Sequence, residues 1–182
     1  MNITVSDLIV RYLERLGIDV IFGMPGAHVL PVYDSLFHSP VNTVLAKHEQ
    51  GASFMAGGYA RMAHRPAACI ATAGPGATNL VTGLADAQID STPVVCITGQ
   101  VPRHLLGSDA FQETDIIGIS TPVTKWNYQI TKASEIPEVI ARAFFIARSG
   151  RPGPVLVDIT KNAQFEELQN LLGLDELASE TS

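Results

Sequence analysis

Residues 67–79 read AACIATAGPGATN, in which seven small or apolar residues are followed at once by Gly74, Pro75 and Gly76. An uninterrupted run of this kind predicts a strand that is buried on both faces of a sheet. The glycines allow the backbone to turn sharply, and the helix predicted over residues 80–89 offers unpaired N–H groups at its start. The stretch therefore predicts a strand, a tight turn and a helix, which is the repeating unit of an α/β sheet.

The same unit recurs on both sides of this stretch. Short apolar runs alternate with helical patterns, which is typical of a parallel sheet covered by helices on both faces. We therefore predict an α/β fold with a doubly wound, mainly parallel sheet. The expected strands are residues 19–22, 42–46, 67–73, 92–98 and 154–159, and the expected helices are a first one capped by Thr4 or Ser6 and stopped by Gly17, then 29–37, 49–62, 80–89 and 135–148.

Four loops of unusual composition each follow a predicted strand. They read GMPGAH at 23–28, KHEQ at 47–50, AGPGATN at 73–79 and GQVP at 99–102. Parallel sheets of this class bind ligands outside the carboxyl ends of their strands, where all four loops are expected to meet. The longer stretch 99–115 is polar and contains glycine, which is typical of functional loops. We expect the functional site at this edge.

The composition narrows the class of partner. The chain has 182 residues, of which 46% are hydrophobic and 16% charged, enough for one domain with a buried core. Twelve Lys and Arg against eighteen Asp and Glu give a net charge of −6 without a basic block, so we expect neither a nucleic acid nor a membrane partner. No signal-peptide pattern and no apolar run near the ~20 residues of a membrane span occur, which predicts a cytoplasmic location.

The residue patterns that metal sites, hydrolase sites and dinucleotide-binding sites require do not occur in this sequence. Cys69 and Cys96 lie in apolar runs and in no Cys/His cluster, so we interpret them as buried thiols. The histidines show no metal-ligand spacing and no serine lies in a GxSxG motif, which removes zinc and serine hydrolase chemistry and leaves no metal site. The turn at 74–79 departs from a dinucleotide fingerprint, because Asn79 replaces the third glycine. A purely structural glycine turn stays an alternative.

Glu49 is the candidate catalytic acid. It lies in LAKHEQGASF at 45–54, at the start of a predicted helix. An acid in the first turn of an exposed helix is common, because it interacts favourably with the helix dipole, and this interpretation also stays open. The residues behind it are small, which indicates a tight interface that would bury the carboxyl and let it hold or exchange a proton near neutrality. These small residues are Gly51, Ala52, Ser53, Ala56, Gly57 and Gly58.

Seven ordered motifs carry a resemblance to a known family. They read FGMPGA, KHEQGASFMAGGYAR, TAGPGATNLVTGLADA, PVVCITGQVP, GSDAFQETD, TKWN and SGRPGPVLVDITK. In this order and spacing they resemble the N-terminal, pyrimidine-binding domain of thiamine-diphosphate enzymes, most closely the large, catalytic subunit of acetolactate synthase. The resemblance implies an α/β domain over residues 1–163 that binds the aminopyrimidine half of the cofactor. Residues 164–182 are expected to form a linker or C-terminal tail.

The resemblance implies a role for each residue that matches a motif. Glu49 matches the glutamate that hydrogen-bonds N1′ of the aminopyrimidine and helps to remove the proton from C2 of the thiazolium, after which the cofactor carries the decarboxylation. The residues that match cofactor-binding positions are Pro25, Gly26, Thr72, Pro75, Asn79 and Gln112, together with Arg151 as an FAD contact in flavin-containing members. The residues that match the substrate channel are Ala27, Val101, Pro102, Ala110, Phe111 and Lys161, whose positive charge suits a keto-acid carboxylate.

Three departures from the family's pattern lie near the channel. Met24 stands where an aromatic residue is common, Ala27 and His28 replace the usual Gly-Ala, and Thr160 replaces the usual proline before Lys161. They leave the second keto acid and the use of FAD open.

The family's members are also much longer. They carry a domain whose GDG…N motif holds Mg²⁺ and the diphosphate, and no such motif occurs in these 182 residues. In the family a complete site lies between the pyrimidine-binding domain of one subunit and the diphosphate-binding domain of another. The resemblance thus implies half a site, which works in a homodimer or higher oligomer and meets Mg²⁺ only through the other domain.

The function that the resemblance implies is decarboxylation of pyruvate on thiamine diphosphate and transfer of the two-carbon unit to a second 2-keto acid, as in branched-chain amino acid biosynthesis. The isolated chain is expected to be inactive. Two alternatives stay open: another thiamine-diphosphate-dependent decarboxylase or acyl transferase, and a noncatalytic remnant or interaction module of the same fold. The motifs DAFQE and TKWN favour the synthase, and an intact Glu49 and Gln112 weigh against the module.

Overall fold

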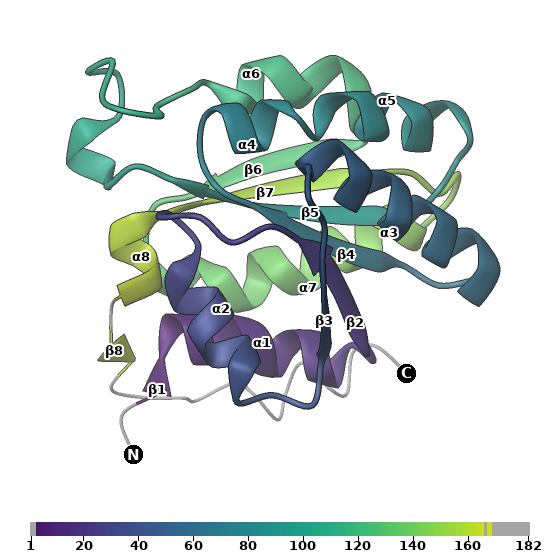
Figure 1. Cartoon of the computed structure of the whole chain (residues 1–182), viewed down its shortest axis with the longest axis horizontal. Helices are drawn as coiled ribbons and strands as arrows, with labels where there is room; N and C mark the ends of the chain where they lie inside the picture. The colour runs from purple at the N-terminus through teal and green to yellow at the C-terminus, as the bar shows by residue number, and fades with distance from the viewer. Residues whose placement is uncertain (1–2, 166, 169–182) are drawn as a thin grey trace.

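A six-stranded sheet forms the centre of the computed structural model, which describes residues 3–165 and 167–168. The strand order is β3-β2-β4-β5-β7-β6, and every neighbouring pair is parallel. Helices cover both faces (Figure 1), which confirms the predicted doubly wound α/β fold. The strands are β2 (Val20–Gly23), β3 (Asn42–Leu45), β4 (Ala67–Ala71), β5 (Val94–Gln100), β6 (Trp126–Ile130) and β7 (Val155–Thr160).

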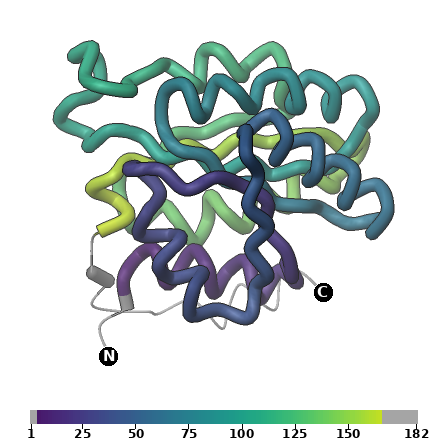
Figure 2. Tube along the Cα trace, viewed as in Figure 1, coloured from purple at the N-terminus to yellow at the C-terminus, as the bar shows by residue number. Residues whose placement is uncertain are grey.

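The helices divide between the two faces of the sheet (Figures 1 and 2). Side chains alternate along each strand, so β4 gives Ala68 and Ile70 to one hydrophobic core and Cys69 to the other. The first core contains α1 (Val5–Arg15), α2 (Leu30–Phe37) and α7 (Ile136–Arg148), and the second contains α3 (Glu49–Ala63), α5 (Val81–Ile89) and α6 (Ile116–Ser120). The shorter elements are β1 (Ile3–Thr4), α4 (Pro75–Thr78), η1 (Arg103–Leu105), η2 (Thr121–Val123), η3 (Ala133–Glu135), α8 (Lys161–Phe165) and β8 (Glu167–Leu168).

An N-cap side chain determines where the first helix begins, and a glycine determines where it ends. Thr4 is the N-cap, and its hydroxyl accepts the backbone N–H of Asp7 at 3.2 Å while the Asp7 carboxylate accepts the backbone N–H of Thr4 at 3.1 Å. This reciprocal pair satisfies two N–H groups that the helix start would leave open. Gly17 follows the C-cap at φ +75°, a conformation that favours glycine. Thr4, one of the two expected caps, is confirmed.

The chain reverses direction across the sheet at β2. From β2 it moves outward to β3, and it then returns to β4 on the other side of β2. The loops that leave the carboxyl ends of β2 and β4 consequently run to opposite sides and leave a crevice between them, which is where ligands bind in open α/β sheets. The sheet order therefore selects the loops at 24–29 and 72–79 as the walls of the candidate site.

The structure differs from the sequence prediction at a few elements. β6 was not expected as a strand, because it is an edge strand with polar and half-exposed residues instead of an apolar run. β3 lies where a strand was predicted; it forms the opposite edge, and its four residues are exposed or half-buried. The turn expected at 74–79 contains a short helix, α4.

The two cysteines lie side by side on neighbouring strands. Cys69 of β4 and Cys96 of β5 are paired in register, and their Sγ atoms are 3.0 Å apart. Both are buried and free, as the sequence predicted.

The expected tail starts inside a helix. Gln164 belongs to α8 and is 1% exposed. Its amide Nε2 donates to the carbonyl oxygen of His28 at 2.8 Å, and the hydroxyl of Ser6 donates to the carbonyl oxygen of Gln164 at 3.1 Å. Residues 166 and 169–182 of the expected tail lie outside the described residues. Within the described part of the chain, no helix combines the length and the apolar character needed to cross a bilayer.

Candidate functional site

Glu49 lies buried at the edge where the site was expected. It is the first residue of α3 and is 4% exposed. His48 is the N-cap, and its Nδ1 accepts the backbone N–H of Gln50 at 3.2 Å, which fixes where the helix starts. The Glu49 oxygen Oε2 accepts a hydrogen bond from Nδ2 of Asn79 at 2.9 Å. Glu49 after β3 and Asn79 after β4 thus meet at this edge of the sheet.

Glycines allow the loops around Glu49 to approach one another. A Cβ added to Gly26 would lie 2.5 Å from Cβ of Thr72, so the loop after β2 packs directly on the residue that follows β4. A Cβ on Gly76 would lie 2.7 Å from Cγ2 of Thr72 and 3.3 Å from Oε1 of Glu49. Backbone therefore forms the wall beside the carboxylate, as a site for close contact with a ligand requires.

Tyr33 is a member of this site that the sequence did not single out. Burial, with the neighbouring Cys69 and Glu49, raises the pKa of its phenol well above the ordinary value. The phenol oxygen is buried and has no hydrogen-bond partner among the described residues. Such groups are rare, and this one lies at the carboxyl end of β2, where a Cβ added to Gly23 would lie 2.5 Å from the phenol oxygen. In the sequence Tyr33 follows the apolar spacing of a helix, which gave no signal beyond core packing.

The loop after β5 reaches the same edge. A Cβ on Gly74, which has φ +60°, would lie 2.7 Å from the carbonyl oxygen of Gln112, so the Gln112 backbone covers the glycine turn. Gln112 itself has φ +63°, which is uncommon for a residue with a side chain. Of the expected channel residues on this loop, Val101 is buried, Pro102 and Ala110 are half-buried, and Phe111 is 83% exposed.

His28 and Lys161 extend the site along the same edge. His28 is 8% exposed, and its backbone N–H donates to Oγ1 of Thr72 at 3.3 Å. Burial and the nearby charge of Lys161 lower the pKa of His28. Its Nδ1 is buried without a hydrogen-bond partner among the described residues. The departure at His28 therefore lies within the site, while Pro25, Ala27 and Pro75 are exposed at its rim.

Arg151 lies apart from these residues. Its guanidinium donates to Oγ of Ser91 at 2.8 Å and to the carbonyl oxygens of Gln88 and Ile89 at 3.2 and 2.9 Å, at the end of α5. Since β7 begins only at Val155, this is the amino edge of the sheet, opposite Glu49.

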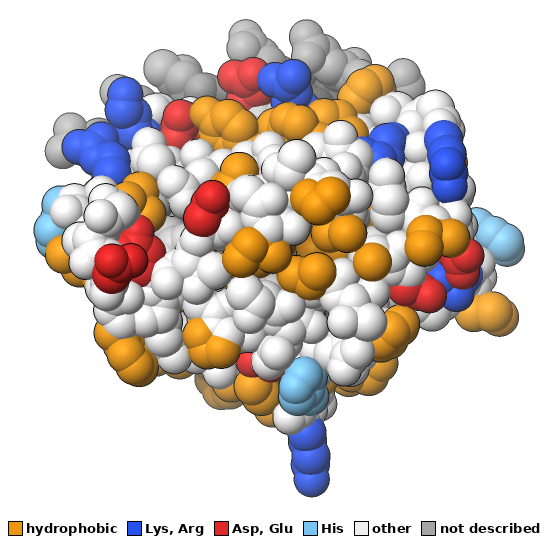
Figure 3. All heavy atoms as spheres, turned by 90° about the horizontal axis from the view of Figure 1, so that it is seen from above, with side chains coloured by type: hydrophobic (Ala, Val, Ile, Leu, Met, Phe, Trp, Pro, Cys, Tyr) orange, Lys and Arg blue, Asp and Glu red, His pale blue; other side chains and the backbone are white. Residues whose placement is uncertain are grey.

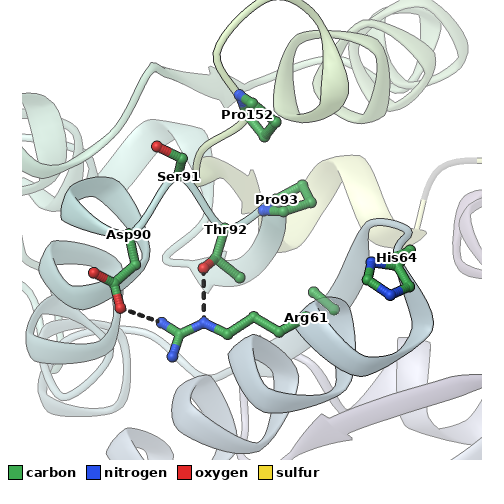
Figure 4. A pocket seen from close by; sticks show the side chains of 8 residues that line it. Arg61, His64, Asp90, Ser91, Thr92, Pro93 and Pro152 are labelled. Atoms are coloured by element: carbon green, nitrogen blue, oxygen red, sulfur yellow. Dashed lines mark hydrogen bonds and ion pairs between the residues drawn. The ribbon is translucent and has the colours of Figure 1, made fainter.

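A hollow of about 470 Å³ lies at this amino edge (Figure 4). Within it, Arg61 donates to Oγ1 of Thr92 at 2.9 Å and forms an ion pair with Asp90 at 3.0 Å. The structure does not bring this hollow together with the Glu49 site.

The fold and the site together define a class: a doubly wound α/β domain with a buried carboxylate and a glycine-walled crevice at its switch point. Residues 3–119 match the family described as thiamine pyrophosphate enzyme, N-terminal TPP binding domain. The chain belongs to this family, which confirms the resemblance seen in its motifs.

Three of the relatives found by sequence carry the name acetolactate synthase. The chain is 60% identical over 162 residues to the acetolactate synthase large subunit IlvB1 of Mycobacterium tuberculosis and 54% identical over 162 residues to the acetolactate synthase isozyme 1 large subunit of Escherichia coli. It is 52% identical over 160 residues to the chloroplastic acetolactate synthase of Arabidopsis thaliana. The matches cover 88%, 88% and 87% of this chain but 26%, 29% and 24% of the relatives, so the chain spans about a quarter of their length.

The residues present fit one half of thiamine diphosphate. The buried Glu49 carboxylate and the backbone wall at Gly26 and Gly76 suit a flat ring that carries nitrogen donors and acceptors, as does the Tyr33 hydroxyl, which has no hydrogen-bond partner among the described residues. Among the described residues no group of three or more His, Cys, Asp or Glu is placed to hold a metal ion.

Proposed function

We propose that this chain supplies the pyrimidine-binding half of an acetolactate synthase active site, in which pyruvate is decarboxylated and its two-carbon unit is transferred to a second 2-keto acid. The observation that carries the proposal is the Glu49 carboxylate, which is buried at the switch point and held by Asn79 beside the glycine walls. The 51–60% identity to proteins named acetolactate synthase supports it.

Each residue of the site has a role that follows from its position. Asn79 holds Oε2 of Glu49, which leaves Oε1, beside Gly76, to share a proton with N1′ of the aminopyrimidine. When bound, thiamine diphosphate supplies the carbon nucleophile and the electron sink for decarboxylation. The glycine walls keep the ring against the carboxylate, and the burial of Glu49 excludes water from the shared proton. Lys161, near His28, supplies a positive charge for the keto-acid carboxylate.

The remaining parts of the enzyme are proposed from the relatives. Mg²⁺ and the diphosphate would bind to a domain outside the matched quarter of their length, in another chain or another part of the enzyme. A homodimer or higher oligomer would bring that domain to the crevice, and the enzyme would be cytoplasmic. Apolar side chains gather on the face formed by α3–α6 (Figure 3), where Phe54, Met55 and Ile119 are exposed, which suits such an assembly.

FAD receives less support than thiamine diphosphate. The Arg151 guanidinium already donates hydrogen bonds to Oγ of Ser91 and to the carbonyl oxygen of Ile89 at the end of α5. It also lies at the edge of the sheet opposite Glu49. We therefore propose FAD only as a group bound away from the carboxylate, with no part in the proton transfer.

The proposed function is tested by a chimera. Residues 3–163 replace the matching segment of the E. coli isozyme 1 large subunit, which is 54% identical over the matched part. With thiamine diphosphate and Mg²⁺ the chimera is expected to form acetolactate from pyruvate, because the family's pyrimidine side is intact, while the 182-residue chain alone is expected to release no more CO₂ than the cofactor does.

Two outcomes would contradict the proposal. One is a chimera that folds, as judged by size-exclusion chromatography and circular dichroism, but forms no acetolactate, which would favour a noncatalytic module. The other is CO₂ release by the isolated chain, which would show that it holds a complete site.

A further inference from the structure

The loop 101–115 contains little regular structure (Figure 2). Hydrogen bonds within the loop nevertheless stabilise it. The carboxylate of Glu113 accepts the backbone N–H groups of Gly107, Ser108 and Ala110, the last two at 3.1 Å each. These hydrogen bonds lower the pKa of Glu113, as backbone donors around a carboxylate do. The loop therefore has a defined shape, and the remaining question is what fixes its two ends to the sheet.

One side chain contacts both ends of this loop. Gln100, the last residue of β5, is 1% exposed. Its Oε1 accepts the backbone N–H of Val101 at 2.9 Å, where the loop leaves the strand. Its Nε2 donates to the carbonyl oxygen of Thr114 at 3.0 Å, where the loop comes back. A single amide group thus closes a loop of fourteen residues, 101–114.

Asp158 determines which way this amide points. Asp158 lies on β7 and is fully buried, and its carboxylate accepts from Oγ1 of Thr98 at 2.7 Å, from Nε2 of Gln129 at 2.9 Å and from Nε2 of Gln100 at 3.2 Å. An ionised carboxylate only accepts, so it requires the nitrogen of the Gln100 amide on its side. The oxygen is then directed to Val101, the orientation that the loop entry needs.

The loop contacts the candidate site through Gln112. The Gln112 backbone lies against Gly74, as described above, and Gly74 begins the turn that leads to Gly76 and Asn79 beside Glu49. A loop released at its ends would lose this support, and the Gln112 backbone would no longer be held against Gly74.

We propose that Gln100, oriented by Asp158, is a positioning residue: it clamps both ends of the loop 101–114 and so holds Gln112 against the glycine turn of the site. The importance of Gln112 for the reaction rests on the proposed function, whereas the clamp itself does not. A clamp of this kind acts without touching a ligand.

The test compares two variants of the full chain. Gln100→Met removes the amide that contacts the loop, and Gln129→Met removes an amide that contacts the same Asp158 but does not touch the loop. Amide hydrogen exchange, read by mass spectrometry without any cofactor, reports on peptides from 101–115. Trypsin cleavage after Arg103 gives a second measure of loop opening, and thermal denaturation reports the overall stability.

The clamp predicts that Gln100→Met speeds exchange in 101–115 and cleavage at Arg103 by about tenfold, because the buried N–H of Val101 loses its partner and the Thr114 carbonyl keeps only the N–H of Ile116. A loss of about 1.4 kcal/mol corresponds to that factor of ten. Exchange in β4 should change far less, and Gln129→Met should leave the loop within about twofold of the wild type at a similar loss in thermal stability. Equal loop exchange in both variants, or no change in Gln100→Met, would overturn the proposal.

The same two variants, made in the chimera, test whether the clamp positions Gln112 for cofactor binding. Gln100→Met is expected to raise the KM for thiamine diphosphate more than it lowers kcat, because Gln112 loses its place, and Gln129→Met is expected to change neither. An opened loop with an unchanged KM would overturn the link to the site. An inactive unmutated chimera would instead contradict the proposed function, and loop exchange would still decide the clamp.

Discussion

Asp158 is a carboxyl buried without a cation beside it among the described residues. Burial raises its pKa to about 6, although the hydrogen bonds from Thr98, Gln129 and Gln100 act in the opposite direction, and the charge of Asp115 adds to the rise. Its proton is therefore bound more tightly in the folded chain than in the unfolded chain, where the ordinary value of 3.8 applies. The resulting stability is complete below about pH 4 and is lost as the pH rises through about 6.

Asp158→Asn is expected to remove this dependence. The difference between 3.8 and about 6 corresponds to roughly 3 kcal/mol of unfolding free energy over the whole titration, of which roughly 2 kcal/mol falls between pH 4 and pH 6.5. Urea unfolding at both pH values would measure it as the difference between wild type and variant. If the two chains change in parallel with pH, Asp158 does not titrate in this range.

At the scale of elements, the small residues of α3 divide into two groups. Ala52 and Ala56 pack into the core of the sheet face that α3 covers, and Ser53 faces Gly83 of α5. A Cβ on Gly83 would lie 2.0 Å from Oγ and 2.5 Å from Cβ of Ser53. A Cβ on Gly58 would meet nothing within 4 Å. Internal packing thus explains part of the run, and the glycines with open space are those that suit an outside partner.

Gly83→Ala and Gly58→Ala form a matched pair of substitutions. Gly83→Ala is expected to destabilise the chain by about 2 kcal/mol, because α5 and α3 must move apart. Gly58→Ala is expected to stabilise it by about 0.5–1 kcal/mol through helix propensity, since no neighbour is displaced. Denaturant unfolding of the two variants measures both values. A stabilising Gly83→Ala would contradict the close packing of these helices.

Apolar runs predicted most of the central strands, because a strand that is buried on both faces consists almost entirely of apolar residues, and such a run is visible in the sequence. The same rule missed Trp126–Ile130, since an edge strand keeps polar side chains such as Asn127 and Gln129. It also missed the role of Asp158, which reads as one polar residue within a strand. Its partners Thr98 and Gln100 lie about 60 residues away, and only strand pairing brings them together.

At the scale of the whole molecule, the site results from the order of the strands. The sequence could place Glu49, Thr72 and Asn79 at one sheet edge, but the switch point between β3, β2 and β4 is a property of the assembled sheet. It brings together residues from three loops and leaves Arg151 at the other edge. The chain spans about a quarter of the length of these relatives, and the crevice is the part of the proposed site that its described residues form.

The most direct test of the account is the rate at which the C2 proton of thiamine diphosphate exchanges with deuterium on the chimera, read by NMR after acid quench. Glu49→Gln keeps the shape of the side chain but cannot share a proton with N1′, so exchange is expected to slow by a factor on the order of 100 or more. The neighbouring Gln50→Ala should leave the rate nearly unchanged. A Glu49→Gln chimera that binds the cofactor and exchanges the proton as fast as the parent would contradict the role of Glu49.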